Sequence, residues 1–418
     1  INTEAYLFTA RSRVSVRRHA RLVDYHMHDG CSARVWAQLL IDDAVVGAVN
    51  LPQGTQLLTA VPGLPARFLE NSQTYRDALS NAPEFFETLH AARLFAAHNT
   101  LCFYTWGDSR CVLPRGATRA TLSGHFPDLR SGDVLIFEEQ RGAKSGDPAD
   151  SNPNQRFAVR LLDVSLSRDE LTETDVTEIR WYAEDALPAP LCLSSDVPPD
   201  VELACDGAMS VAHGNIVLAD HGRTSPIEAL GSMPASSLVY VSPTQRCDQE
   251  LPDAVPARFR PQLQQPLVAQ HVGYIHELAQ TRSAHWAMQL SPASTLPAIQ
   301  LALDPDFADE IWWPQRDLLN SAGDEPEFVL EVENDGRAYV RFGNDENARR
   351  PNAGDTFYAR YRTGDSLAGN IGSDALAHVV SNQAAILGVR NPLPGYGGAV
   401  PEPIEAVRQL SLIHISEP

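Results

Sequence analysis

A chain of 418 residues is longer than a single hydrophobic core usually organises, so we expect about two to four packed modules. Its formal charge of -20 repels phosphate backbones and anionic lipid, which argues against nucleic acid and membranes as partners. We find no run of about 18 apolar residues that could span a bilayer, and Ile1 does not open a signal peptide. The 30 prolines and 26 glycines favour turns and short strands, so the composition predicts a β-rich architecture.

The opening of the chain has a helical pattern over residues 2–23, and Ser12 is placed to cap a second helical segment. This is the only strongly basic stretch of an acidic protein, so it could dock an acidic neighbour, although a solvated helix face is an alternative. The arginines concerned are Arg11, Arg13, Arg17, Arg18 and Arg21.

Short β-like runs follow. We expect residues 33–41 and 45–51 to form a hairpin around Asp42-Asp43, a short helix within 85–95, and a strand over 101–106. Further strands are predicted at 120–122, 133–138, 157–164, 178–182 and 211–218.

Prolines near residue 200 indicate a module boundary, and the proline-rich stretch 243–266 indicates a long exposed excursion. Residues 328–332 and 337–342 alternate around Asn334-Asp335-Gly336, which predicts a hairpin. A strand is expected at 357–361, a short strand or helix at 374–380, and an amphipathic helix from Pro403.

The predicted fold is therefore α+β and mainly β, with several modules. They are an N-terminal helical segment (1–28), the first part of a β-rich core (29–117), a small inserted β-barrel or sandwich module (118–200), an extended, irregular β segment with long loops (201–324), a C-terminal β module with short helices (325–410) and an atypical tail (411–418).

The cysteines are scattered, form no Cys-x-x-Cys motif and have no histidine at the spacing typical of a zinc site. We therefore predict reduced thiols without a structural role, which points to assembly in a cytoplasm. The residues are Cys31, Cys102, Cys111, Cys192, Cys205 and Cys247.

Histidines offer two candidate metal sites, and neither is favoured. His213 and His221 would lie at opposite ends of one strand, about 25 Å apart. His26, His28 and Asp29 are close in sequence and could hold a metal, but an ordinary helix-to-strand connector has the same residues.

Paired carboxylates could indicate glycosidase chemistry, at Glu138 with Glu139 or at Glu331 with Glu333. We expect the second pair to lie on a solvated edge that discourages strand pairing. Trp312-Trp313 could anchor a partner or fill a core. Because no Gly-x-Ser-x-Gly elbow and no phosphate-binding loop is present, we predict no catalytic residues and no cofactor. The spacing of the histidines and cysteines predicts no metal.

A set of glycine-containing motifs follows in fixed order near the C-terminus. Gly369 and Gly372 would permit a tight bend, and Gly397-Gly398 a sharp entry into the helix near Pro403. The whole motif comprises Gly354, Gly364, Gly369, Asn370, Gly372, Asn391, Pro392, Gly397 and Gly398.

Together with Leu51-Pro52-x-Gly54-Thr55 and the run Gly214 to Thr224, these motifs resemble baseplate assembly proteins of the J-like baseplate wedge family. That family occurs in contractile phage tails and phage-tail-like injection systems. The resemblance covers nearly the whole chain and implies J-like modules in the first β-rich part and at the C-terminus.

The resemblance implies a structural component that joins a baseplate ring and links hub and tube to sheath. Its partners would be other wedge and hub proteins and copies of itself, with assembly in the cytoplasm before incorporation into a virion tail or injection particle. The alternatives are a baseplate-associated cell-wall glycan hydrolase, which needs a convergent carboxylate pair or metal, and a glycan-binding tail module, which needs exposed aromatics over a shallow groove.

Overall fold

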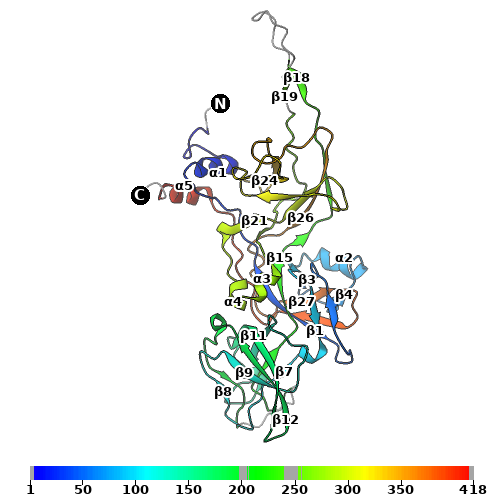
Figure 1. The fold of residues 1–418 in the computed structure, drawn as a ribbon, viewed down its shortest axis with the longest axis vertical. Coiled ribbons are helices and arrows are strands. Elements are labelled where there is room, and N and C mark those ends of the chain that lie inside the picture. Colours follow the sequence, from blue (N-terminus) through cyan, green and yellow to red (C-terminus); the bar gives the residue numbers. More distant parts are fainter. Residues whose placement is uncertain (1–3, 197–204, 206, 240–252, 256, 414–418) are drawn as a thin grey trace, which may run out of the picture.

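A computed structural model describes residues 4–196, 205, 207–239, 253–255 and 257–413. The protein is a multidomain, β-rich α+β chain built around barrel-like and half-barrel sheets, as the sequence predicts. The molecule is elongated: a six-stranded barrel lies at one end, a first seven-stranded sheet in the middle and a second seven-stranded sheet beyond it (Figure 1).

The first sheet takes strands from both ends of the chain. Its order is β28 (Ile386–Arg390), β1 (Arg34–Ile41), β15 (Ile216–His221), β5 (Phe85–Thr88), β3 (Gln56–Thr59), β27 (Leu376–Val380) and β4 (Arg67–Phe68). Because β28 also lies against β27 and β4, the sheet curls into a barrel-like shape. The side chains of Leu57, Phe86 and Val217 are fully buried in its core.

The structure corrects two sequence predictions here. The hairpin predicted from residues 33–41 and 45–51 is wrong. The first strand is present as β1, but it pairs with β15 and β28, while β2 (Val49–Leu51) pairs with β6 (Ala92–Leu94). The helix expected within 85–95 is wrong, because β5 and β6 occupy that segment. Aromatic residues at 85 and 86 suit a pleated surface better than a helix.

The six-stranded sheet closes into a small barrel. Its order is β7 (Leu101–Cys102), β14 (Ser210–His213), β10 (Val134–Glu139), β11 (Arg156–Asp169), β12 (Thr174–Trp181) and β9 (Arg119–Ser123). A bridge between Phe103 and Leu122 joins the two outer strands. The barrel encloses a core that contains Phe137 and Trp181, whose ring centroids are 5.2 Å apart.

The single strand predicted over 211–218 is instead two strands in different sheets. The chain leaves β14 of the barrel and enters β15 of the first sheet through Gly214 and Asn215. Asn215 has φ +55°, and its side chain bonds both the N–H (2.9 Å) and the carbonyl (2.8 Å) of Phe95. A Cβ on Gly214 would lie 2.9 Å from the carbonyl oxygen of His98, so the crossing requires glycine.

The second seven-stranded sheet has the order β16 (Arg223–Thr224), β26 (Thr356–Thr363), β22 (Ile299–Ala302), β23 (Ile311–Gln315), β24 (Glu327–Val332) and β25 (Ala338–Phe342), with β17 (Glu228–Ser232) also paired to β26. The predicted hairpin around Asn334-Asp335-Gly336 is confirmed as β24–β25. Trp312 packs edge-on against Phe342 and Phe357 in the core, whereas Trp313 is half exposed.

Three two-stranded ribbons and several short helices complete the modules. The ribbons are β8 (Val112–Leu113) with β13 (Leu191–Cys192), β18 (Ser237–Val239) with β19 (Asp253–Val255), and β20 (Gln270–Val272) with β21 (Thr295–Pro297). The short helices are α2 (Gln73–Ser80), α3 (His276–Gln280) and α4 (Ala284–Ala287). Of the excursion predicted for 243–266, residues 243–252 and 256 lie outside the described residues. The prediction of an exposed segment is wrong for its last part, because Leu263 is buried in the core of the second seven-stranded sheet and Gln262 bridges Tyr339 of β25.

The two ends of the chain meet. Helix α1 (Arg13–Arg21) packs against α5 (Ile404–Ile413), which is the helix expected from Pro403 (Figure 1). Val16, Ala20 and Val407 are buried between them, and Ser12 caps α1 by accepting from the Ser15 N–H. Over the described part of the chain, no helix is both long and apolar enough to cross a membrane.

Candidate functional site

The arginines of α1 already contact carboxylates of the same chain. Arg13 and Arg17 both bind Asp29, Arg18 lies 2.6 Å from Glu331, and Arg21 binds Asp317. Arg13 also donates to the carbonyl oxygens of His28 and Glu402, each at 2.6 Å. An acidic neighbour would therefore compete with intramolecular partners for the four arginines of α1. Arg11, the fifth arginine of the predicted docking surface, precedes α1 and is exposed.

Glu331 is a buried carboxylate surrounded by arginines. Besides Arg18, it accepts from Arg260 (2.9 Å) and Arg341 (3.1 Å). Burial alone would raise the pKa of Glu331, but the arginines outweigh it and hold the pKa below its usual value. The expectation of a solvated edge is thus wrong for Glu331, which is 4% exposed and fastens α1 to the second seven-stranded sheet.

Glu138, like Glu331, is a buried carboxylate between two modules, in this case the barrel and the first sheet. On β10, it accepts from Arg390 of β28 (2.8 and 3.0 Å) and pairs with Arg156 of β11 (2.8 Å), while His213 Nε2 lies 3.0 Å away. Asp374 pairs with both arginines, at 2.8 Å and 2.9 Å. This network joins the two modules through side chains that are far apart in sequence.

The electrostatics of Glu138 keep it ionised. Burial by itself would raise its pKa, but hydrogen bonds from His213 and Arg390 lower it from 4.5 to about 2. A carboxylate with that pKa carries no proton near neutrality, so it cannot serve there as a general acid. Its neighbour Glu139 is only partly buried and accepts from the Asn152 N–H.

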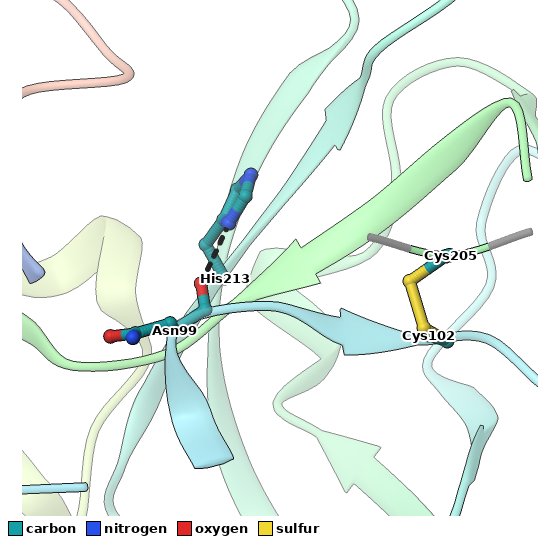
Figure 2. Close-up of a disulfide and its surroundings, with 4 residues drawn as sticks. All are labelled: Asn99, Cys102, Cys205 and His213. Carbon is teal, nitrogen blue, oxygen red and sulfur yellow. Dashed lines mark hydrogen bonds between the residues drawn. A yellow bond between two sulfur atoms is a disulfide. The ribbon is translucent and has the colours of Figure 1, made fainter. Parts of the chain in front are cut away.

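The histidines that the sequence singled out lie in separate places. His213 points from β14 toward the carbonyl oxygen of Asn99, with Nδ1 at 3.0 Å (Figure 2). His221, at the end of β15, lies 2.8 Å from Glu84 and edge-on to Phe86. No group of three potential metal ligands gathers among the described residues, and the Nδ1 of His28 instead accepts from the Gly30 N–H.

Several glycines of the motif lie where backbone and side chains approach closely. A Cβ on Gly369 would lie 2.6 Å from the His221 side chain, and one on Gly398 would lie 2.1 Å from the Ser366 carbonyl oxygen. A Cβ on Gly364 would lie 3.1 Å from His221 and from Gly222, while Gly354 and Gly397 have φ +93°. Gly369 lies in a turn, and the close approach of His221 leaves no room there for a side chain, whereas the space beside Gly372 is open.

The asparagines of the motif tie these loops together. Asn370 both accepts from the Gly398 N–H and donates to its carbonyl oxygen, each at 2.9 Å. The fully buried Asn391 donates to the carbonyl oxygens of Gly372 and Leu393 and accepts from the Leu376 N–H. The Pro392 carbonyl oxygen accepts from Arg156, so the motif also contributes to the Glu138 junction.

The prediction that all cysteines are reduced and without a structural role is wrong. Cys102 on β7 forms a disulfide with Cys205, 103 residues further along the chain (Figure 2). The bond closes a loop that contains most of the barrel. Cys31, Cys111 and Cys192 are free, and Cys247 lies outside the described residues. No short-range spacing announces a pair so far apart in sequence.

No protein-family profile matches this chain, and no curated protein matches it. Among solved structures, it is similar to a chain of the type VI secretion system TssK-TssF-TssG baseplate subcomplex, determined by cryo-electron microscopy. The identity is 11% and the TM-score 0.36, over 94% of this chain and 72% of that chain.

Proposed function

We propose that this chain is a structural wedge component of the baseplate of a contractile tail or phage-tail-like injection particle. The baseplate assignment is supported by the ordered glycine and asparagine motif from Gly354 to Gly398, with the resemblance that it carries. A mechanical role is supported by the two buried carboxylates. Glu138 forms ion pairs with arginines between the barrel and the first sheet, and Glu331 forms ion pairs with arginines between α1 and the second seven-stranded sheet. In this role, the chain links neighbouring wedge and hub subunits as one rigid body.

The exposed apolar surface around α1 carries the assembly part of the proposal. Tyr6 is 73% exposed, Phe8 65% and Leu22 82%, although the two helices beside them bury their own apolar faces. Glu4 accepts from the N–H groups of Arg11 and Ser12 and so holds the segment of Tyr6 and Phe8 beside the helix. Large apolar side chains that are presented on ordered elements are typical of protein interfaces.

A triple variant, Tyr6→Glu, Phe8→Glu and Leu22→Glu, tests this surface. We expect it to fold normally, since none of these side chains is buried, and to fail to incorporate into the particle. The matched control is Val46→Glu, a fully exposed apolar residue on the turn after β1. The measurement is the amount of each variant in purified particles, at equal expression and equal melting temperature. Normal incorporation of the triple variant would contradict this interface.

The hydrolase alternative makes a different demand. A glycosidase needs one carboxyl group that can donate a proton and a second one within about 5 to 10 Å of it. In both candidate pairs, arginines stabilise the ionised form of one member, which is Glu138 in the first pair and Glu331 in the second. Release of sugar fragments from purified cell wall, abolished by Glu138→Gln or Glu331→Gln in a folded protein, would favour the hydrolase over the wedge.

A further inference from the structure

An exposed tryptophan lies at the outer end of the barrel. Trp106 follows β7 and is 61% exposed, and Leu171, in the turn between β11 and β12, is 96% exposed. The two segments are connected, because the Tyr104 hydroxyl bonds Asp169 (2.6 Å) and lies 2.8 Å from Thr172. Trp106 packs edge-on against Tyr104, with ring centroids 5.2 Å apart.

The loop that carries Trp106 is fixed at several points. The Cys102–Cys205 disulfide ties its start, and Ser194 donates to the Asp108 carbonyl oxygen at 2.6 Å near its end. Asp196 accepts from both Ser109 and Arg110. Trp106 itself has φ +53°, a conformation that costs energy for a residue with a Cβ and persists only where the surroundings impose it. The indole is therefore presented in a fixed orientation without being needed for a core.

The surroundings of Trp106 are acidic. Arg110 and Arg168 are the arginines of the Trp106 loop and of the end of β11, and each pairs with a carboxylate, Asp196 and Glu173 respectively. Carboxylates outnumber these arginines on the same segments and on the segment after β13 that binds the Trp106 loop: Asp108, Asp169, Glu170, Glu173, Asp175 and Asp196. An exposed indole on segments with an excess of carboxylates suits a guanidinium or ammonium group, which can make a cation–π contact and ion pairs together.

We propose that the tip of the barrel, formed by the loop of Trp106 and the turn between β11 and β12, binds a basic segment of a partner protein. An arginine or lysine side chain of that segment stacks on Trp106. Charge complementarity selects this occupant, and Leu171 adds an apolar contact beside it. The proposal goes beyond the wedge role and does not depend on it, since the barrel lies at the opposite end of the molecule from α1 and α5 (Figure 1).

The test is a titration of the full chain with a fluorescein-labelled peptide of alternating arginine and glycine, followed by anisotropy at low salt. We expect Trp106→Ala to weaken binding about threefold to tenfold, as loss of a cation–π contact implies. Trp313→Ala is the matched control, because that indole is also half exposed but lies on β23. A peptide with glutamate in place of arginine should not bind.

Because the whole chain has a charge of -20, part of any binding will be nonspecific, so the contrast between the two variants decides. Equal affinities of Trp106→Ala and Trp313→Ala for the arginine peptide would overturn the proposal. A failure of the wild type to bind the arginine peptide would also overturn it. If the wild type instead binds chito-oligosaccharides and Trp106→Ala does not, the tip is a glycan site.

Discussion

Reduction of the Cys102–Cys205 disulfide is expected to lower the free energy of unfolding by about 4 to 5 kcal/mol, one of the two largest effects that we predict. Cross-linking residues 103 apart removes much of the conformational freedom of the unfolded chain, and loops of about 100 residues give roughly this gain. The barrel core is small and its outer strand β7 has only two residues, so the loss should appear first in that module.

Urea denaturation with and without a thiol reductant measures this effect. A Cys102→Ser variant should unfold like the reduced wild type and respond no further to reductant. Cys192→Ser, which removes a free thiol on β13, is the control and should keep the response to reductant. Identical unfolding of oxidised and reduced wild type would show that the cross-link does not contribute to stability.

Glu138→Gln is expected to destabilise the protein by about 3 kcal/mol, because removing one charge of a buried network leaves Arg156 and Arg390 poorly compensated. Asp374 remains beside both arginines, which keeps the loss at the lower end of the range for buried pairs. Glu139→Gln, next in the chain but less buried, should change stability by less than about 0.5 kcal/mol. Equal denaturation midpoints of the two variants would contradict the junction.

The same carboxylate sets a dependence on pH. Folding lowers the pKa of Glu138 from 4.5 to about 2, so its contribution is complete above pH 4.5 and disappears as the pH falls toward 2. Thermal melting between these pH values should therefore show a steeper loss of stability in the wild type than in Glu138→Gln. Parallel curves for the two proteins would mean that the carboxylate has an ordinary pKa in the folded state.

Local patterns predict the strands of this fold well and their neighbours poorly. The hairpin at Asn334-Asp335-Gly336 was predictable, since its turn and both alternating strands lie within sixteen residues. β1 was also visible as a strand, but its partners β15 and β28 come from segments that lie far along the chain. The choice of those partners depends on the packing of the whole sheet, which no local window of sequence contains.

The junction residues illustrate the same limit. Sequence analysis found Glu138 and Glu331 because each has another glutamate within two residues. The partners that connect them to another module, Arg390 and Arg18, are more than two hundred residues away in sequence. The arginines of α1 stood out as a basic stretch, although the carboxylates that neutralise them come from other segments. Trp106 gave no signal, because the exposure of one indole depends on how the barrel closes around it.

Cryo-electron microscopy of particles purified from cells that carry this gene tests the wedge proposal most directly. We predict density for the six-stranded barrel and both seven-stranded sheets in repeated copies around the tube, with Tyr6, Phe8 and Leu22 against a neighbouring subunit. Deletion of the gene should leave particles without an assembled baseplate. Complete baseplates in the deletion strain, or a map in which this chain has no place, would contradict the account.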